Sequence, residues 1–232
     1  MSNKAVSEFF DSKASETYDE RNRKLSPINN NLHLLIRLIL NDLPENAHIL
    51  CVGVGTGSEI VSLAEAYPKW RFTGIDPSTS MLEACRDKIE KHGLTSRCEL
   101  THGYLASIDE KQKFDAILCL LVTHFVTDDA ERQAMYTGMH ARLTQGGYLI
   151  HADISDDMAS PEFRNILEKW KAMHRFAGAS DASLEHVVTS METHLSVLPK
   201  ATIENFLRNA GFPMPVQFFQ SLLIRAWYSQ KM

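Results

Sequence analysis

The amino-acid sequence predicts an α/β protein in which helices cover both faces of a mostly parallel sheet. The first observation is the regular alternation of short apolar stretches with helical stretches over residues 48–154. The second is a cluster of alternating glycines, Gly53, Gly55 and Gly57, directly after the first apolar stretch. The third is a pair of apolar runs within 216–230 with almost nothing between them, a connection that allows only an antiparallel hairpin.

Each element of this pattern has its own local signal. A stretch with apolar residues at a helical period, 28–43, ends at Pro44. The helix expected after the glycines, 58–67, stops at Pro68, because proline lacks the N–H that a helix interior needs. The apolar and β-branched stretches predict strands at 48–52, 71–76, 97–103, within 114–125, and at 146–154.

The later helices carry capping and charge signals. Ser78 or Thr79 is expected to cap a helix over 78–93. A helix over 128–143 begins with acidic residues and ends with a basic one, as the helix dipole favours. Two further helical stretches are 156–200, which is polar, and 201–212.

The glycine turn predicts a ligand site at the carboxyl end of the first strand. Ligands of open parallel sheets bind at this end, where the turn presents backbone N–H groups and a helix N-terminus. Asp76 ends the second strand, where a carboxylate can accept two hydrogen bonds from ribose hydroxyls. The strand–turn–helix–strand order therefore indicates a nucleoside-binding site.

The glycine spacing distinguishes between two nucleoside classes. A dinucleotide fold has G-x-G-x-x-G, whereas this chain has G-x-G-x-G with Ser58 at the position of the third glycine. The stretch ILCVGVGTG resembles the first motif of class I S-adenosylmethionine-dependent methyltransferases at every position except an acid, which here is Cys51. Further stretches resemble this family in the same order: GIDPSTSML, FDAILCLLVTHF, LTQGGYLI, and FLRNAGF with the closing hairpin. Near the N-terminus, FDSKASETYDER resembles the arm of many small-molecule methyltransferases.

The resemblance implies a Rossmann-like class I methyltransferase fold. Its sheet would have seven strands, mostly parallel, with an antiparallel last strand, helices on both faces and a helical cap. The chain would form a single methyltransferase domain, 1–232. Its parts would be an N-terminal helical arm that covers the site (1–46), a cofactor-binding core (47–154), a helical insertion that caps the site (155–200), and the last helix with the hairpin (201–232).

The resemblance also implies the cofactor, S-adenosylmethionine, and its product, S-adenosylhomocysteine. Asp76 would hold the ribose and Met81 would pack on the adenine. Cys51 and Tyr104 replace acids that the family commonly places near the methionine end and the adenine, and whether they weaken cofactor binding stays open. The residues expected to bind the cofactor are Gly53, Val54, Gly55, Gly57, Asp76, Pro77, Met81, Tyr104, Leu105, Leu120 and Tyr18.

Two residues are candidates for a general base, His124 and Asp153. His124 follows the fourth strand, beside the expected methyl donor. His151 and Asp153 alternate at the end of the fifth strand and so share one face. A base is needed only if the acceptor must lose a proton, since the donor is already activated by its positive charge. No metal site is expected, because neither H-E-x-x-H nor a His/Cys cluster occurs.

The expected function is methyl transfer from S-adenosylmethionine to an unidentified, small-molecule acceptor. One alternative is the carboxy-S-adenosylmethionine synthase branch, a tRNA-modification enzyme that uses prephenate and that the stretches 127–149 and 209–227 resemble. In that branch an arginine stands at the position of Phe206, and Arg208, two residues on, should point elsewhere. A second alternative is a nucleoside-binding pseudoenzyme or sensor, favoured by Cys51 and Tyr104. A nicotinamide oxidoreductase is disfavoured by the glycine spacing and the hairpin.

Composition sets the remaining expectations. With 44% apolar and 23% charged residues, the chain resembles an ordinary globular protein. Its net charge of −5 disfavours a nucleic acid as direct substrate. The acidic, polar N-terminus is unlike a signal peptide, and the four cysteines are scattered, as expected for reduced packing residues. We therefore expect a cytoplasmic protein without membrane contact, and a homodimer stays open.

Overall fold

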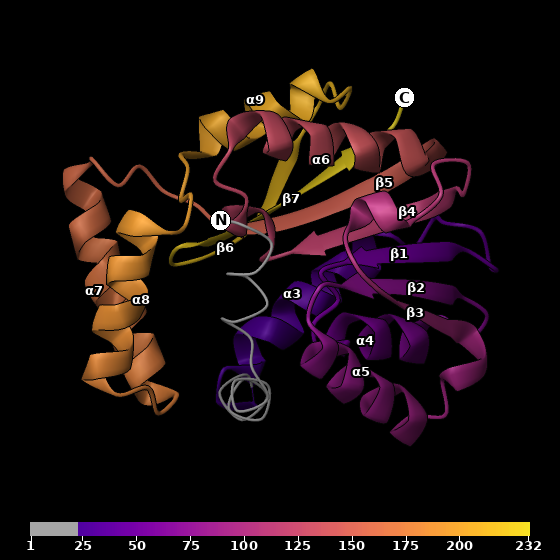
Figure 1. Cartoon of the computed structure of the whole chain (residues 1–232), viewed down its shortest axis with the longest axis horizontal. Helices are drawn as coiled ribbons and strands as arrows, with labels where there is room; N and C mark the ends of the chain where they lie inside the picture. The colour runs from indigo at the N-terminus through magenta and orange to yellow at the C-terminus, as the bar shows by residue number, and fades with distance from the viewer. Residues whose placement is uncertain (1–22) are drawn as a thin grey trace.

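The computed structural model describes residues 23–232, which form a seven-stranded sheet with the order β3-β2-β1-β4-β5-β7-β6 (Figure 1). Strands β3, β2, β1, β4 and β5 are parallel, and β7 is antiparallel to both β5 and β6. The expected fold is therefore confirmed, including the hairpin. The strands are β1 (His48–Val52), β2 (Arg71–Asp76), β3 (Cys98–His102), β4 (Phe114–Leu120), β5 (Leu143–Ile154), β6 (Val216–Ser221) and β7 (Ile224–Gln230).

Helices cover both faces of this sheet. The α-helices of the described residues are α3 (Ser26–Ile39), α4 (Ser58–Ala66), α5 (Thr79–Lys91), α6 (Asp129–Arg142), α7 (Pro161–Phe176), α8 (Asp181–Thr193) and α9 (Lys200–Asn209). The Ser78 hydroxyl caps α5 by accepting the N–H of Met81 at 3.3 Å. None of the helices within residues 23–232 has the length and apolar character that crossing a membrane requires.

Two predicted boundaries were wrong. The helix expected over 28–43 is α3, which ends at Ile39, because the chain turns there and Leu43 N–H bonds to the Leu40 carbonyl. Strand β5 begins at Leu143 instead of residue 146, because Leu143 pairs with Phe114 ahead of a bulge.

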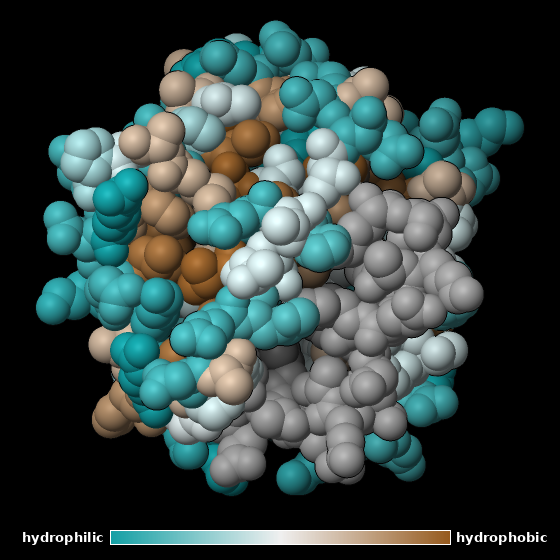
Figure 2. Space-filling view, turned by 60° about the vertical axis from the view of Figure 1, so that its left-hand side comes forward, coloured by the Kyte–Doolittle hydropathy of each residue, from teal (hydrophilic) through white to brown (hydrophobic). Residues whose placement is uncertain are grey.

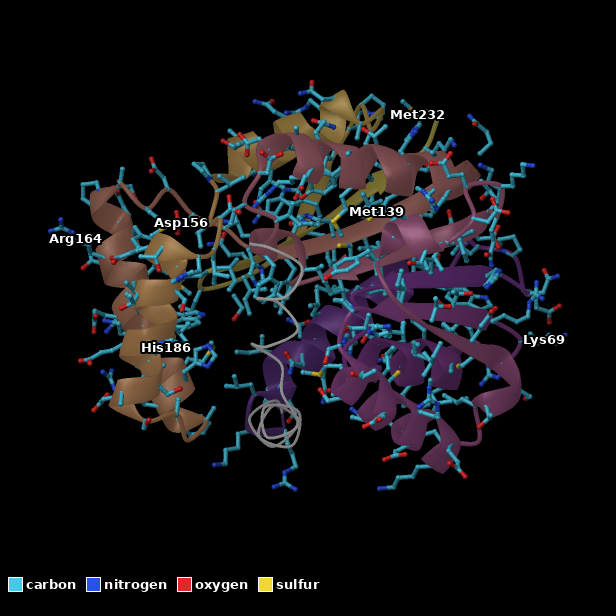
Figure 3. All side chains as sticks on the ribbon, in the orientation of Figure 1. Lys69, Met139, Asp156, Arg164, His186 and Met232 are labelled. Carbon is cyan, nitrogen blue, oxygen red and sulfur yellow. The ribbon has the colours of Figure 1, made fainter. Side chains whose placement is uncertain are left out.

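The core lies in two layers, one on each face of the sheet. Helices α3, α4 and α5 pack on one face, with residues such as Ile36, Leu63 and Leu82. Helices α6 and α9 pack on the other face, where Met139 points into the interior and is fully buried (Figure 3). This burial leaves the carboxyl ends of the parallel strands as the place for polar chemistry.

Helices α7 and α8 form a pair that lies apart from these layers, at the left of Figure 1. They share a small apolar core that includes Phe163, Trp170 and Leu184, while Arg164 points outward (Figure 3). The outer surface on this side is mostly hydrophilic, with apolar residues visible in a recess (Figure 2). The two ends of the insertion meet, since the Ser155 hydroxyl donates to the Leu198 carbonyl at 2.8 Å.

Candidate functional site

The three glycines after β1 all adopt left-handed backbone conformations, with φ of +67° at Gly53, +51° at Gly55 and +76° at Gly57. A Cβ on Gly53 would lie 2.4 Å from Val122, and a Cβ on Gly57 would lie 2.5 Å from the sulfur of Cys85. A Cβ on Gly55 would meet nothing within 4 Å. Gly53 and Gly57 therefore allow close packing, whereas Gly55 leaves open space beside the turn.

Asp76, at the end of β2, is held against this turn. One carboxylate oxygen accepts the Gly55 N–H at 2.9 Å, and the other accepts the Ser78 N–H at 2.8 Å. Burial raises the pKa of Asp76, and these two hydrogen bonds oppose that rise. Each oxygen keeps a further lone pair, so the carboxylate is fixed in place with capacity for ligand hydroxyls.

A cavity of about 440 Å³ lies beside Asp76, a size that suits a small-molecule ligand. It is mostly apolar, and its walls come from the ends of β1, β2 and β4, from the stretch after β3, and from α6. The predicted cofactor residues that line it are Gly53, Gly55, Asp76, Pro77, Met81, Tyr104, Leu105 and Leu120.

A second, more polar cavity of about 1010 Å³ adjoins the first. The two share Gly53, Gly55, Leu120 and Leu121 in their linings, so they meet at the glycine turn and the end of β4. The second cavity also holds Val54, together with charged and polar side chains from α3 and α4. Gly57 is outside both linings. The predicted Tyr18 lies outside the described residues.

The junction between the cavities contains a strained residue. Leu121 has φ of +60°, a conformation that side chains other than glycine rarely adopt. Its N–H donates to the Ala152 carbonyl at 2.7 Å, which ties the loop after β4 to β5. Such strain often occurs at ligand sites, and here it lies where both cavities meet.

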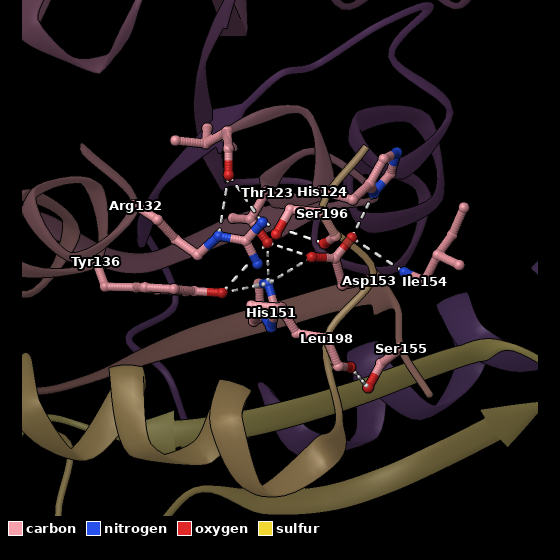
Figure 4. Close-up of polar contacts among 11 residues, drawn as sticks. Thr123, His124, Arg132, Tyr136, His151, Asp153, Ile154, Ser155, Ser196 and Leu198 are labelled. Atoms are coloured by element: carbon pink, nitrogen blue, oxygen red, sulfur yellow. Dashed lines mark hydrogen bonds and ion pairs between the residues drawn. The ribbon is translucent and has the colours of Figure 1, made fainter. Parts of the chain in front are cut away.

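The loop after β4 carries His124 into contact with Asp153 (Figure 4). His124 Nδ1 bonds to one oxygen of the Asp153 carboxylate, and the Thr123 hydroxyl donates to the other. Asp153 is fully buried and His124 is 4% exposed. The two candidate bases of the sequence analysis therefore form one histidine–carboxylate pair.

The contacts of Asp153 determine which ring nitrogen of His124 carries the proton. Burial raises the pKa of Asp153, but the His124 ring and the Thr123 hydroxyl outweigh that effect and leave the pKa below its usual range. An ionised Asp153 can only accept hydrogen bonds, so the Nδ1 of His124 must carry a proton. In the neutral ring the lone pair is then on Nε2, which has no hydrogen-bond partner within the described chain.

His151 and Tyr136 extend this buried polar cluster. His151 Nε2 lies 3.0 Å from both the Tyr136 hydroxyl and the Thr123 hydroxyl. Burial lowers the pKa of His151 to about 4, with the Arg132 guanidinium also lowering it. His151 is therefore neutral near pH 7 and does not form an ion pair with the Asp153 carboxylate.

Arg132, on α6, joins the loop after β4 to the end of the insertion. It is fully buried, and its Nη2 donates to the carbonyls of Val126 at 2.8 Å and Ser196 at 3.2 Å. Its guanidinium lies 5.9 Å from the ring centroid of Phe206. The Ser196 N–H also donates to the His124 carbonyl at 2.8 Å. His124 is thus held through its side chain by Asp153 and through its backbone carbonyl by Ser196.

Comparison with known proteins finds a family model that matches part of the chain. Residues 49–147 match the family described as "Methyltransferase domain". This stretch is a class I methyltransferase domain. Among curated proteins, this chain is 24% identical to a carboxy-S-adenosyl-L-methionine synthase of Campylobacter lari, over 91% of this chain and 89% of that one. The enzyme of the same name from Dichelobacter nodosus is 25% identical, over 86% and 82%.

Solved structures share the fold of this methyltransferase domain. Magnesium protoporphyrin IX methyltransferase from Synechocystis PCC 6803, solved with bound SAH, superposes with a TM-score of 0.70 at 16% identity and covers 99% of both chains. An O-methyltransferase family protein from Burkholderia thailandensis superposes with a TM-score of 0.65 at 14% identity. That comparison covers 95% of this chain but 60% of the other. These likenesses establish the architecture.

Several residues of the site had no signal of their own in the sequence. Thr123, Tyr136 and Arg132 join the cluster only through the packing of α6 against the loop after β4. Glu59 and Arg37 line the second cavity from two different helices. Within residues 23–232, no group of three or more potential metal ligands is arranged to hold an ion. The binding roles of the predicted residues stay predictions.

Proposed function

We propose that this protein transfers the methyl group of S-adenosylmethionine to a hydroxyl group of a small-molecule acceptor. The observation that carries the proposal is the pair of adjoining cavities that meet at Gly53 and Leu121, with Asp76 in the first. The apolar cavity suits an adenine with its ribose on Asp76. The polar cavity suits the charged amino-acid end of the same molecule.

The cofactor would supply an activated methyl group on a positively charged sulfur. The residues of this chain would position the two reactants and exclude water. His124 lies between Val122 and Phe125, which both line the apolar cavity. It would take the proton of the acceptor hydroxyl at Nε2, and Asp153 would hold the ring and stabilise the imidazolium that forms. A hydroxyl acceptor fits this histidine–carboxylate pair, because a hydroxyl group must lose its proton when it is methylated.

A screen of small hydroxylated aromatic compounds with methyl-labelled S-adenosylmethionine tests the proposal. The proposal fails if no compound acquires the label.

Replacing Asp76 with alanine is expected to weaken the binding of S-adenosylhomocysteine by about tenfold to a hundredfold. The lost hydrogen bonds to a carboxylate are each worth about 1.5–3 kcal/mol. Isothermal titration calorimetry measures the effect, with circular dichroism to check the fold. The wild type should bind S-adenosylhomocysteine and S-adenosylmethionine and should not bind NAD. Binding of NAD alone would overturn the assignment, and unchanged affinity in Asp76→Ala would place the ribose elsewhere.

The curated relatives support a second candidate, carboxy-S-adenosylmethionine synthesis. That reaction requires a cation for an extra carboxylate near the sulfonium, since a buried carboxylate without a partner is strongly disfavoured. Arg208 pairs with Glu204 at 3.1 Å on the outside of α9. Arg132 is the cation near Phe206, but it lies outside both cavity linings and donates to backbone carbonyls. These placements favour methyl transfer over the carboxylated donor.

Incubation with prephenate and S-adenosylmethionine separates the two candidates. We expect no carboxylated donor, because the four residues that both cavity linings share, Gly53, Gly55, Leu120 and Leu121, are all uncharged. Mass spectrometry of the nucleoside products gives the result. Catalytic accumulation of carboxy-S-adenosylmethionine would replace the proposed function by the second candidate.

A further inference from the structure

The polar cavity is lined by cationic and anionic side chains from different elements. Helix α3 contributes His33 and Arg37, the residues just before it contribute Arg23, and α4 contributes Glu59 and, towards the outside, Glu65. Burial lowers the pKa of His33 to about 4, so His33 is neutral near pH 7 and the charge contributed by α3 and the residues before it comes from the arginines. Such an arrangement matches a zwitterion with a carboxylate and an ammonium group.

Arg37 has an unused donor in this cavity. Its Nε is buried, and none of the described residues accepts a hydrogen bond from it. A buried donor without a partner is costly, so a ligand oxygen at this position would be favourable. The wall formed by α3 is therefore suited to a carboxylate.

Glu59 is the matching anion in this cavity. It lies in the first turn of α4, partly buried, and no salt bridge joins it to any described residue. The nearby Lys88 ammonium donates instead to the hydroxyls of Thr56 at 2.9 Å and Ser58 at 3.1 Å. Cys51, at the end of β1, cannot supply a charge, because burial raises the pKa of its thiol well above the usual value.

We propose that Glu59 binds the α-ammonium group of the cofactor's amino-acid end, with Arg37 facing its carboxylate. The inference rests on the proposed function and assigns a residue to one end of the same site. Glu59 would thereby supply the negative charge that β1 lacks at Cys51. Because the ammonium group is absent from 5′-methylthioadenosine, this nucleoside provides a ligand that occupies the apolar cavity without using Glu59.

The test compares two ligands with two variants by calorimetry. Glu59→Gln should weaken the binding of S-adenosylhomocysteine by about tenfold to a hundredfold, since a charge-assisted hydrogen bond is lost. Its affinity for 5′-methylthioadenosine should stay within about twofold, which also shows that the variant is folded. The control Glu90→Gln removes the same charge from an exposed position on α5, outside both cavities, and should change neither affinity.

The pH dependence gives a second readout. Burial raises the pKa of Glu59 to about 7, with Asp76 also raising it and Lys88 lowering it. The ionised fraction of Glu59 then increases about tenfold between pH 6 and pH 8, and the affinity for S-adenosylhomocysteine should increase in proportion. His33, across the cavity, stays neutral throughout this range. Neither Glu59→Gln with S-adenosylhomocysteine nor the wild type with 5′-methylthioadenosine should show this increase.

The possible outcomes distinguish a failure of the Glu59 assignment from a failure of the proposed function. If the wild type binds both ligands but Glu59→Gln weakens neither, or weakens both equally, Glu59 does not hold the ammonium group and the proposed function stands. If the wild type binds neither ligand, the proposed function and this assignment both fail. Selective loss of S-adenosylhomocysteine binding supports both.

Discussion

Replacing His124 with glutamine should lower the rate of methyl transfer by about 10²–10⁴-fold, the usual contribution of a general base. The affinity for S-adenosylhomocysteine should stay unchanged, because His124 lines neither cavity and contacts Asp153 instead. The measurement is the turnover number with an acceptor found in the hydroxyl screen, alongside calorimetry with S-adenosylhomocysteine.

His92→Gln is the matched control, since it removes a partly exposed histidine at the end of α5. It should keep wild-type turnover. If His124→Gln also keeps wild-type turnover, the acceptor loses its proton to another group or needs no base, and the assigned role of the pair is wrong.

Replacing Asp153 with alanine should lower the free energy of unfolding by about 3–5 kcal/mol, since each buried donor left without its acceptor costs about 1–3 kcal/mol. Three groups would lose the acceptor that Asp153 provides: the Thr123 hydroxyl, His124 Nδ1 and the Ile154 N–H. Urea unfolding measures the loss. The surface control Asp181→Ala removes a carboxylate 2.6 Å from Arg175 and 74% exposed, and should cost at most about 1 kcal/mol. Equal losses in the two variants would contradict the buried role.

The stability that Asp153 contributes should depend on pH with a defined sign. Its pKa in the folded protein lies below the ordinary value of 3.8, so the unfolded chain binds the proton first as the pH falls. The contribution is complete above that ordinary value and is lost as the pH decreases through the folded pKa. The difference in unfolding free energy between the wild type and Asp153→Ala should therefore shrink in acid and stay constant near pH 7.

The sequence was sufficient for the fold because its local and long-range signals agree. Glycine spacing, Asp76 and the short link between the last two strands each constrain the topology independently. The boundaries of α3 and β5 were less predictable, since turns and a bulge depend on pairing across the sheet.

The candidate site was predictable only in part. Residues at strand ends, such as Asp76 and His124, could be placed because parallel strands bring their carboxyl ends to one edge. The contact between His124 and Asp153 could not, because it depends on how the loop after β4 folds back on β5. Glu59 and Arg37 had no local motif, since their relation depends on how α3 packs against α4.

The hydrogen bond between Ser155 and Leu198 has a consequence for how such a protein can diversify. The chain leaves the sheet at Ser155 and returns to it at Leu198, and these two residues are in contact. The 42 residues of 156–197 therefore form an insertion with closely spaced ends. Insertions, deletions or wholesale exchange within this stretch need not disturb the strand order, because its two attachment points stay fixed. This stretch can then change while Asp76 and the glycine turn, which lie outside it, keep their positions.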